Sequence, residues 1–171
     1  MYTKILVPLD GSESSLAGLN EAIQIAAEHS SAIRLLHVVE VPSPLLDYGY
    51  SQGDCRSAVL ASLCRVGKNI LNKAETIVRE HGLSADCLLY ESGSSSASDI
   101  ILEQARLWGA SLIVMGAHTP SARGRIGRVS SDVIAESVSP VLMVQGVAPV
   151  ASASVGHREL NYDFAPAAAA R

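Results

Sequence analysis

The segment from Gly116 to Ser131 carries three glycines, three arginines and several hydroxyl side chains within sixteen residues. Glycine lets a ligand approach the backbone closely, hydroxyl groups donate hydrogen bonds, and arginine offers a forked positive charge. This mixture of side chains suits a phosphate group. Glycine and serine are also ordinary turn residues, so the pattern by itself leaves a plain loop as the alternative.

Asp10 is the second candidate, because it follows an aliphatic run and precedes Gly11 and Ser12. A carboxylate at this place can accept a hydrogen bond from a ribose hydroxyl or an adenine amine. It can also cap the helix that begins after it, because the free N–H groups of a first helical turn bind Asp. The glycine that follows and the position at a strand end favour the binding interpretation.

The sequence lacks the patterns that are typical of bond-breaking chemistry. Ser12 and Ser14 have no evident His and Asp partners, and neither a GxSxG elbow, a P-loop lysine nor an HExxH motif occurs. The carboxylates are scattered, and Cys55, Cys64 and Cys87 do not have the spacing of a zinc site or a disulfide framework. We therefore expect no catalytic residues, no metal ligands and no enzymatic activity.

Four near-continuous aliphatic runs and a weaker fifth, Asp86–Tyr90, must position these candidate residues. Near-continuous aliphatic runs suit strands that are covered on both faces, as in a parallel sheet. The expected strands are Lys4–Leu9, Ile33–Val39, Asp86–Tyr90, Leu112–Met115 and Pro140–Val144.

Helical spacing of apolar residues fills the intervals between the strands. The expected helices follow Ser12 and Ser14, run through Leu63–Ile77 and Ile101–Trp108, and extend from Gly127 to Ser137. Strict alternation with right-handed crossovers predicts an open α/β sandwich, in which helices cover both faces of a five-stranded parallel sheet. Ligands bind such sheets beyond the carboxyl ends of the strands, where the strand order reverses and where helix N-termini favour anions.

The overall composition narrows the class of protein. The 171 residues carry a formal net charge of −4, which argues against a nucleic-acid binder held by phosphate contacts. No apolar run reaches the roughly 18 to 20 residues that span a bilayer, so we expect no membrane association. We expect one domain over residues 1–146, a long loop over residues 40–54, and a disordered C-terminal tail over residues 147–171.

Several motifs resemble those of the universal stress proteins, in family order and with family-like spacing: Ile5–Ser12, Leu35–Val39, Leu112–His118, Gly127–Ile134 and Ser139–Val144. The resemblance covers about residues 2–146. It implies a Rossmann-like, adenine nucleotide alpha hydrolase-like fold, a cytoplasmic location, and a homodimer formed through the last strand, Pro140–Val144. One branch of this family binds ATP, and another branch lacks the nucleotide motif.

The chain departs from the motif of the ATP-binding branch, which is Gly, two residues, Gly, nine residues, and Gly followed by Ser or Thr. Gly116 matches the first position, but Thr119 occupies the second, and only seven residues separate it from Gly127. Arg128 stands where the hydroxyl residue is expected. The resemblance therefore implies a nucleotide pocket with an altered phosphate loop. Ser121, Ser130 and Ser131 could replace the missing donor.

The strand ends and the resemblance together give the candidate nucleotide-binding residues, which are Pro8, Asp10, Gly11, Val38, Gly116, His118, Thr119, Gly127, Arg128 and Ser130. The expected ligand is ATP, with Mg²⁺ carried by its phosphates, and the expected role is nucleotide sensing in a stress response. The altered residues 119 and 128 support an alternative, a nucleotide-independent interaction protein with an unidentified protein partner.

Overall fold

The computed structural model describes residues 1–40, 53–93, 95–117 and 127–145, with side chains from residue 57 onward in the helix that begins at residue 53. Strands and helices alternate along the chain, as the aliphatic runs predict. The elements are β1 (Lys4–Pro8), α1 (Glu13–His29), β2 (Ala32–Val39), α3 (Gly53–Glu80), β3 (Ala85–Glu91), α4 (Ala97–Trp108), β4 (Leu112–Ala117), α5 (Arg128–Glu136) and β5 (Val141–Gln145).

The five strands form one parallel sheet in the order β3-β2-β1-β4-β5. Ile5 in β1 pairs with Ile33 in β2 on one side and with Leu112 in β4 on the other. The chain adds strands outward from β1 to β3, then crosses back and continues outward on the opposite side. The strand order therefore reverses between β1 and β4, which is where a crevice opens at the carboxyl edge of such a sheet.

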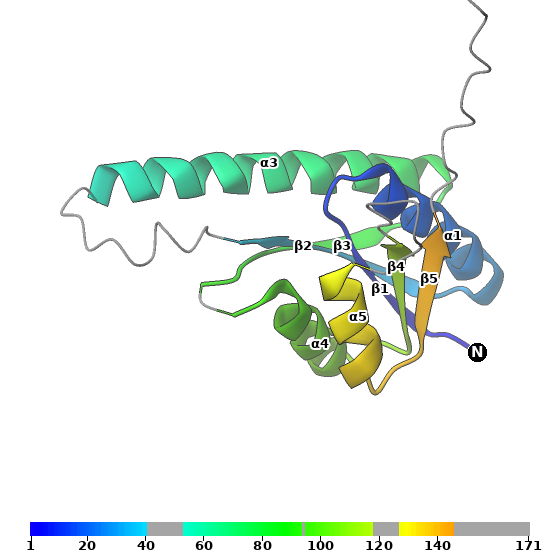
Figure 1. The fold of residues 1–171 in the computed structure, drawn as a ribbon. Helices are drawn as coiled ribbons and strands as arrows, with labels where there is room; N and C mark the ends of the chain where they lie inside the picture. Colours follow the sequence, from blue (N-terminus) through cyan, green and yellow to red (C-terminus); the bar gives the residue numbers. More distant parts are fainter. Residues whose placement is uncertain (41–52, 94, 118–126, 146–171) are drawn as a thin grey trace, which may run out of the picture.

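Helices cover both faces of this sheet (Figure 1). Helices α1 and α3 bury one face, and their residues pack with Ile5 and Val7 of β1. Helices α4 and α5 bury the other face, against Leu6 of the same strand. Alternate residues of β1 thus enter two separate cores, which explains why the strand is continuously aliphatic. The predicted fold class is confirmed.

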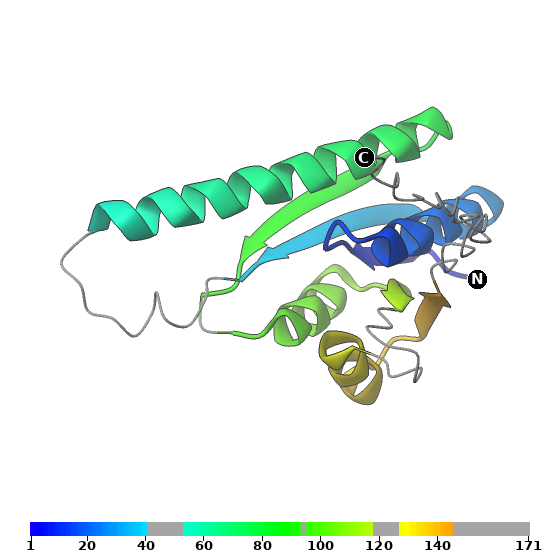
Figure 2. The ribbon, with the colours of Figure 1, turned by 45° about the horizontal axis from the view of Figure 1, so that its top comes forward.

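Helix α3 is longer than the sequence periodicity predicts. It begins at Gly53, ten residues before the first periodic residue, Leu63, so residues 53 and 54 are helical rather than part of the predicted loop. Its 28 residues span about 42 Å at 1.5 Å per residue. Figure 2 shows its N-terminal half projecting beyond the ends of the strands. The periodicity of apolar residues is weak in this N-terminal half, because only the C-terminal half of α3 packs on the sheet along its whole length.

The two edges of the sheet are β3 and β5. The last strand begins at Val141, one residue later than predicted, and its first four residues are all partly exposed. The last strand is therefore an edge strand of the sheet.

Candidate functional site

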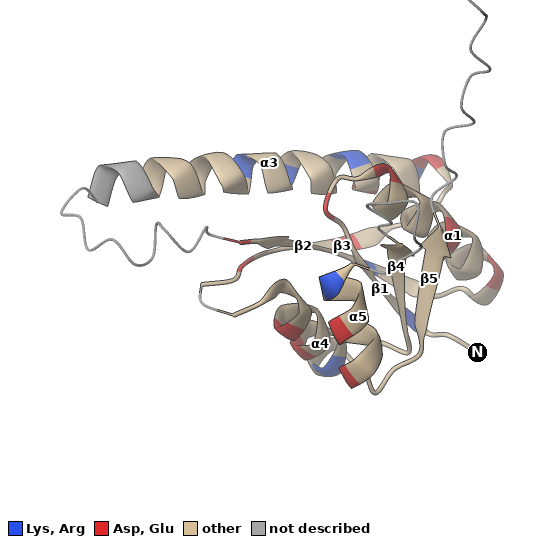
Figure 3. Ribbon diagram, viewed as in Figure 1, with Lys and Arg blue, Asp and Glu red and all other residues tan. Residues whose placement is uncertain are grey.

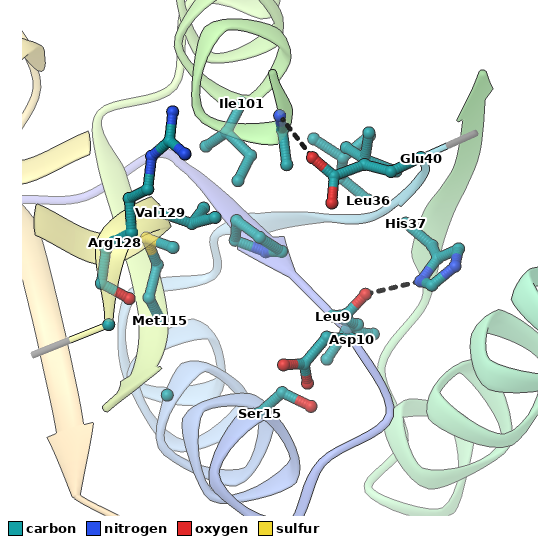
Figure 4. Close-up of a pocket in the computed structure, with 16 residues that line it drawn as sticks. Leu9, Asp10, Ser15, Leu36, His37, Glu40, Ile101, Met115, Arg128 and Val129 are labelled. Atoms are coloured by element: carbon teal, nitrogen blue, oxygen red, sulfur yellow. Dashed lines mark hydrogen bonds between the residues drawn. The ribbon is translucent and has the colours of Figure 1, made fainter. Parts of the chain in front are cut away.

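A cavity of about 350 Å³ lies at the carboxyl edge of the sheet, beyond the ends of the neighbouring strands β1 and β4 (Figure 4). The ends of β1, β2 and β4 and the first turns of α1, α4 and α5 form its walls. Its lining residues are Pro8, Leu9, Asp10, Ser15, Leu36, His37, Val38, Glu40, Ala97, Ile101, Met115, Gly116 and Gly127 to Ser130. Most of this lining is apolar, with charged groups at a few places.

Asp10 contributes a carboxylate to the cavity and also organises the start of α1. Its Oδ1 accepts hydrogen bonds from the backbone N–H of Ser12 (2.9 Å) and from the Ser12 hydroxyl (2.6 Å). Ser12 is the N-cap of α1, and its Oγ accepts from the N–H of Ser15 (3.1 Å). The two interpretations of Asp10 are therefore compatible, because one side chain supports the cap and lines the cavity.

The end of β2 contributes two polar side chains to the walls. His37 Nδ1 lies 2.7 Å from the carbonyl oxygen of Leu9 and ties β2 to the end of β1. Glu40 extends from the end of β2 to the first turn of α4, where its Oε1 accepts a hydrogen bond from the backbone N–H of Ala97 (3.2 Å) (Figure 4). Glu40 thus binds the first turn of α4 from outside that helix.

Gly116 allows the end of β4 to lie directly against the start of α1. A Cβ on Gly116 would overlap the backbone carbonyl group of Ser14, which belongs to the first turn of α1. The approach is close from the other side as well, since a Cβ on Gly18 would lie 3.1 Å from the Gly116 nitrogen. Within the described residues, the lack of a side chain at Gly116 thus allows α1 and β4 to pack closely against each other.

The first turn of α5 forms the opposite wall. Its N-cap is Gly127, which makes no side-chain cap hydrogen bond, and its first turn contains no acidic residue. Figure 3 shows a basic residue, Arg128, at the start of this helix. The Nε of Arg128 lies 3.8 Å from Oδ2 of Asp132, and the Arg128 side chain is 89% exposed. Ser130, in the same turn, is buried.

Three helix N-termini therefore meet at one cavity, and their capping differs. Helix α1 is capped by Ser12. Helix α4 has a complete capping box formed by Ser96 and Asp99, with Glu40 on the N–H of Ala97. Helix α5 starts at a glycine, so no side chain of its own occupies its first N–H groups. Free N–H groups and the positive end of the helix dipole make the start of α5 a suitable place for an anion.

Seven of the ten predicted site residues line the cavity: Pro8, Asp10, Val38, Gly116, Gly127, Arg128 and Ser130. Gly11 does not line it and instead adopts φ +84°, where a Cβ would lie 2.9 Å from Cδ1 of Ile70, so Gly11 serves the turn. His118 and Thr119 lie outside the described residues.

Val38 of β2 was predicted, but Glu40, Ala97 and Ile101 also line the cavity and were not predicted from the sequence. Serines such as Ser96 indicate where a helix starts, but the place of that helix in the fold depends on the strand order. Because α4 follows the edge strand β3 and crosses to β4, its first turn passes over the crevice. The carboxyl-edge rule could have placed this turn near Asp10, since all the strands are parallel.

Two kinds of feature are absent from the described part of the chain. It contains no group of three or more His, Cys, Asp or Glu side chains that could hold a metal ion. None of its helices is both long enough and apolar enough to cross a membrane.

The sequence model of the universal stress protein family matches residues 1–145, and the chain belongs to this family. Universal stress protein YxiE of Bacillus subtilis is 31% identical over 151 residues, covering 85% of this chain and the whole relative. A universal stress protein of Methanocaldococcus jannaschii is 31% identical over 147 residues, covering 85% of this chain and 83% of the relative.

Solved structures of the family have the same fold. A universal stress family protein from Burkholderia pseudomallei superposes with a TM-score of 0.68 at 27% identity, covering 84% of this chain and 96% of that protein. An Archaeoglobus fulgidus universal stress protein in complex with dAMP has a TM-score of 0.58 at 24% identity, covering 84% and 98%. An Arabidopsis thaliana family protein with AMP bound has a TM-score of 0.63 at 18% identity, covering 85% and 93%.

Proposed function

We propose that this protein binds an adenine nucleotide in the cavity at the carboxyl edge of the sheet, and that it acts by binding rather than by turnover. The observation that carries the proposal is the uncapped first turn of α5, which faces an otherwise mainly apolar cavity. Arg128 adds a positive charge at the same turn, and Asp10 adds a hydrogen-bond acceptor on the wall across from it. Family proteins solved with AMP and dAMP support a nucleotide as the occupant.

The chemistry of the walls suggests how the ligand lies. Val38, Ile101 and Met115 offer apolar surface to a purine ring. The carboxylate of Asp10 accepts from a ribose hydroxyl or an adenine amine. The N–H groups at the start of α5, with the Ser130 hydroxyl and the Arg128 guanidinium, receive the phosphate.

ATP is the ligand that the family resemblance implies, and its own phosphates would carry Mg²⁺ because the described residues offer no metal cluster. Occupancy would signal the nucleotide level to a partner protein in the cytoplasm. The altered motif at Thr119 and Arg128 favours the second candidate, a nucleotide-independent interaction protein. Failure of every adenine nucleotide to bind would favour that second candidate.

Homodimerisation through β5 is part of the proposal. An edge strand presents unpaired backbone groups, and a second copy of the same strand covers them symmetrically. The partly exposed residues Val141 to Val144 give this edge an apolar character. Size-exclusion chromatography with light scattering at micromolar concentration checks it, and a monomeric mass would contradict it.

The decisive test of nucleotide binding begins with mass spectrometry of any small molecule released when the purified protein is denatured, together with calorimetric titration of AMP and ATP. Gly127→Asp places a carboxylate on the uncapped turn of α5. Because φ is −61° and ψ is 156° at this position, Asp fits the backbone and caps the helix. We expect nucleotide affinity to fall about 100-fold, since charge-assisted hydrogen bonds worth about 1.5–3 kcal/mol are lost.

The matched control is Ala135→Asp, which adds the same charge to an exposed position of the same helix. It should leave nucleotide affinity within about twofold of the wild type, because exposed charges this far along the helix are screened. Equal loss of affinity in both variants would contradict a phosphate site at Gly127. A large fall in melting temperature for Gly127→Asp without ligand would make that glycine structural instead.

A further inference from the structure

The charged side chains of the cavity follow the order of the strands. Strand β1 lies between β2 and β4 in the sheet. Figure 4 accordingly shows Asp10, at the end of β1, between Arg128 on one side of the cavity and Glu40 on the other. With the phosphate at the first turn of α5 and the purine ring on Val38 and Ile101, the ribose lies beside Asp10. Asp10 and Glu40 therefore face different parts of the nucleotide, and Glu40 is the acidic group on the purine side.

One oxygen of the Glu40 carboxylate is held by the protein and the other is not. Oε1 accepts a hydrogen bond from the backbone N–H of Ala97 at 3.2 Å. Figure 4 shows the second oxygen turned away from α4. Within the described part of the chain, this second oxygen, Oε2, makes no hydrogen bond. The contact with Ala97 thus fixes the carboxylate on the cavity wall and leaves one acceptor atom for a ligand.

The surroundings of Glu40 bring the edge of a purine ring to this acceptor. Val38 precedes Glu40 by two residues, Ile101 lies about one turn beyond Ala97 in α4, and both line the cavity with apolar side chains. A ring that lies on these side chains places its edge near the carboxylate. A donor on that edge forms a charge-assisted hydrogen bond, whereas an acceptor is repelled.

The edge of a purine carries either a donor or an acceptor at position 6. Adenine has an amino group there, whereas guanine and hypoxanthine have a carbonyl oxygen. An ionised carboxylate can only accept hydrogen bonds. It therefore favours the 6-amino group, and a site built on such a contact strongly rejects an analogue that lacks the donor, because the polar group of the site loses its partner.

We propose that Glu40 is a specificity-determining residue, whose Oε2 accepts a hydrogen bond from the 6-amino group of the bound base. The cavity thereby selects 6-aminopurine nucleotides over 6-oxopurine nucleotides, and Asp10 accepts from the ribose. This inference rests on the proposed nucleotide-binding function and names the class of base that the site takes.

The first test compares nucleotides that differ only in the base. The full chain is titrated calorimetrically with AMP and IMP, and then with ATP and ITP, at fixed ionic strength. We expect each adenine nucleotide to bind about 10-fold to 100-fold more tightly than its hypoxanthine counterpart, because one charge-assisted hydrogen bond is lost. Purine riboside 5′-monophosphate has only a hydrogen atom at position 6, so its affinity should lie between those of AMP and IMP.

Glu40→Gln tests whether Glu40 makes this selection. The Ala97 N–H needs an acceptor, so the carbonyl oxygen of Gln stays on Ala97 and its NH2 group takes the place of Oε2. Because NH2 donates, the preference should reverse, and IMP should bind at least as tightly as AMP. A general electrostatic role would strengthen AMP and IMP alike and leave their ratio unchanged. Glu40→Ala removes both oxygens and should bring the ratio to about one, which keeps the test available if Glu40→Gln proves unfolded.

Glu91→Gln is the matched control, because Glu91 ends the strand β3 at the same edge of the sheet, is exposed and does not line the cavity. It removes one negative charge nearby and should leave the ratio of AMP to IMP affinity unchanged. Melting curves measured by circular dichroism verify that each variant is folded at the titration temperature.

The outcomes separate the two proposals. An unchanged ratio in the folded Glu40 variants, or an equal shift in Glu91→Gln, would overturn the role of Glu40. Equal wild-type affinities for AMP and IMP would overturn the selectivity while leaving nucleotide binding intact. Tighter wild-type binding of IMP would overturn it too, since the carboxylate would then accept from the N1–H of a 6-oxopurine. Absence of binding by all these nucleotides would overturn the proposed function, and the selectivity with it.

Discussion

Helices α4 and α5 pack against each other and begin at the same cavity, yet their first turns are built in opposite ways. Helix α4 starts with Ser96, whose side chain and that of Asp99 bind each other's backbone groups, and Glu40 binds another N–H. Helix α5 starts with Gly127 and Arg128 and has neither a side-chain cap nor an acid in its first turn. The first arrangement stabilises the helix by itself, whereas the second leaves donors for an external anion.

The comparison teaches that the capping state of a helix can separate structural from ligand-binding positions when both face one cavity. Good caps raise stability, and their absence at a cavity wall therefore marks a place where another group is expected to bind. Helix α1 belongs with α4 in this respect, because Ser12 caps it.

The largest loss of stability should come from a substitution at the contact between β4 and α1, which both line the cavity. Gly116→Ala introduces a Cβ that overlaps the Ser14 carbonyl, so β4 must move away from α1. We expect a loss of about 3 kcal/mol in the free energy of unfolding, measured by urea denaturation, since overpacking against backbone is not relieved by side-chain rotation.

Gly82→Ala is the control for this variant. Gly82 has φ +75° with no atom within 4 Å of the added Cβ, so it tests backbone strain without a clash. Its expected cost is about 1 kcal/mol. Equal losses in the two variants would show that the Gly116 position tolerates a side chain and that the close approach is not required.

A smaller effect sharpens the contrast between the two helix starts. Ser96→Ala removes the cap of α4, and we expect the free energy of unfolding to fall by about 1 kcal/mol. Nucleotide affinity should change less than about twofold, because the cap is not the ligand position. Ser131→Ala, an exposed serine in α5, should change stability by less than about 0.5 kcal/mol. Loss of affinity in Ser96→Ala at unchanged stability would reverse the assigned roles.

The smallest effect is a dependence of stability on pH that comes from the capping box of α4. Hydrogen bonds with the side chain and then the backbone of Ser96 hold the pKa of Asp99 below its usual value. The stability that Asp99 contributes is therefore present above the pKa of the unfolded chain, about 3.9, and is lost as pH falls through the lower folded-state pKa. Asp99→Asn should remove this part of the acid dependence of unfolding.

Urea denaturation between pH 2 and pH 6 measures the difference between Asp99→Asn and the wild type. Glu103→Gln removes an acid from an exposed position of the same helix and is the control. A wild-type stability that falls with acid no faster than that of Asp99→Asn would show that the capping box adds no acid dependence.

Much of the fold could be predicted from the sequence because four strands are near-continuous aliphatic runs and apolar residues recur at helical spacing between the strands. The two loops after β1 and β4 could also be placed at one edge, since parallel strands share their carboxyl ends. The N-terminal extension of α3 could not, because residues 53–62 lack a periodic apolar face, and helix propagation needs no such face once the rest has packed.

The site was predicted less completely than the fold, for a reason of geometry. Glu40 and Ala97 reach the cavity through the order of the strands, which is a property of the whole sheet rather than of any segment. Gly116 matches a motif position, but the nearby backbone of Ser14 explains its lack of a side chain within the described residues. The motif match thus pointed to a residue that lines the cavity, and the contacts of that residue give it a role in packing.

The pairing of β1 with β4 in the middle of the sheet joins two segments that are synthesised at very different times. Ile5 pairs with Leu112, a separation of 107 residues (112 − 5), and the hydroxyl of Ser111 accepts hydrogen bonds from the N–H groups of Thr3 and Lys4. A ribosome must therefore synthesise the chain as far as β4 before β1 finds its second neighbour. Long-range pairing of this kind slows folding, because a large loop must close before its contacts form. Until then, the nascent chain leaves one edge of β1 without its neighbouring strand.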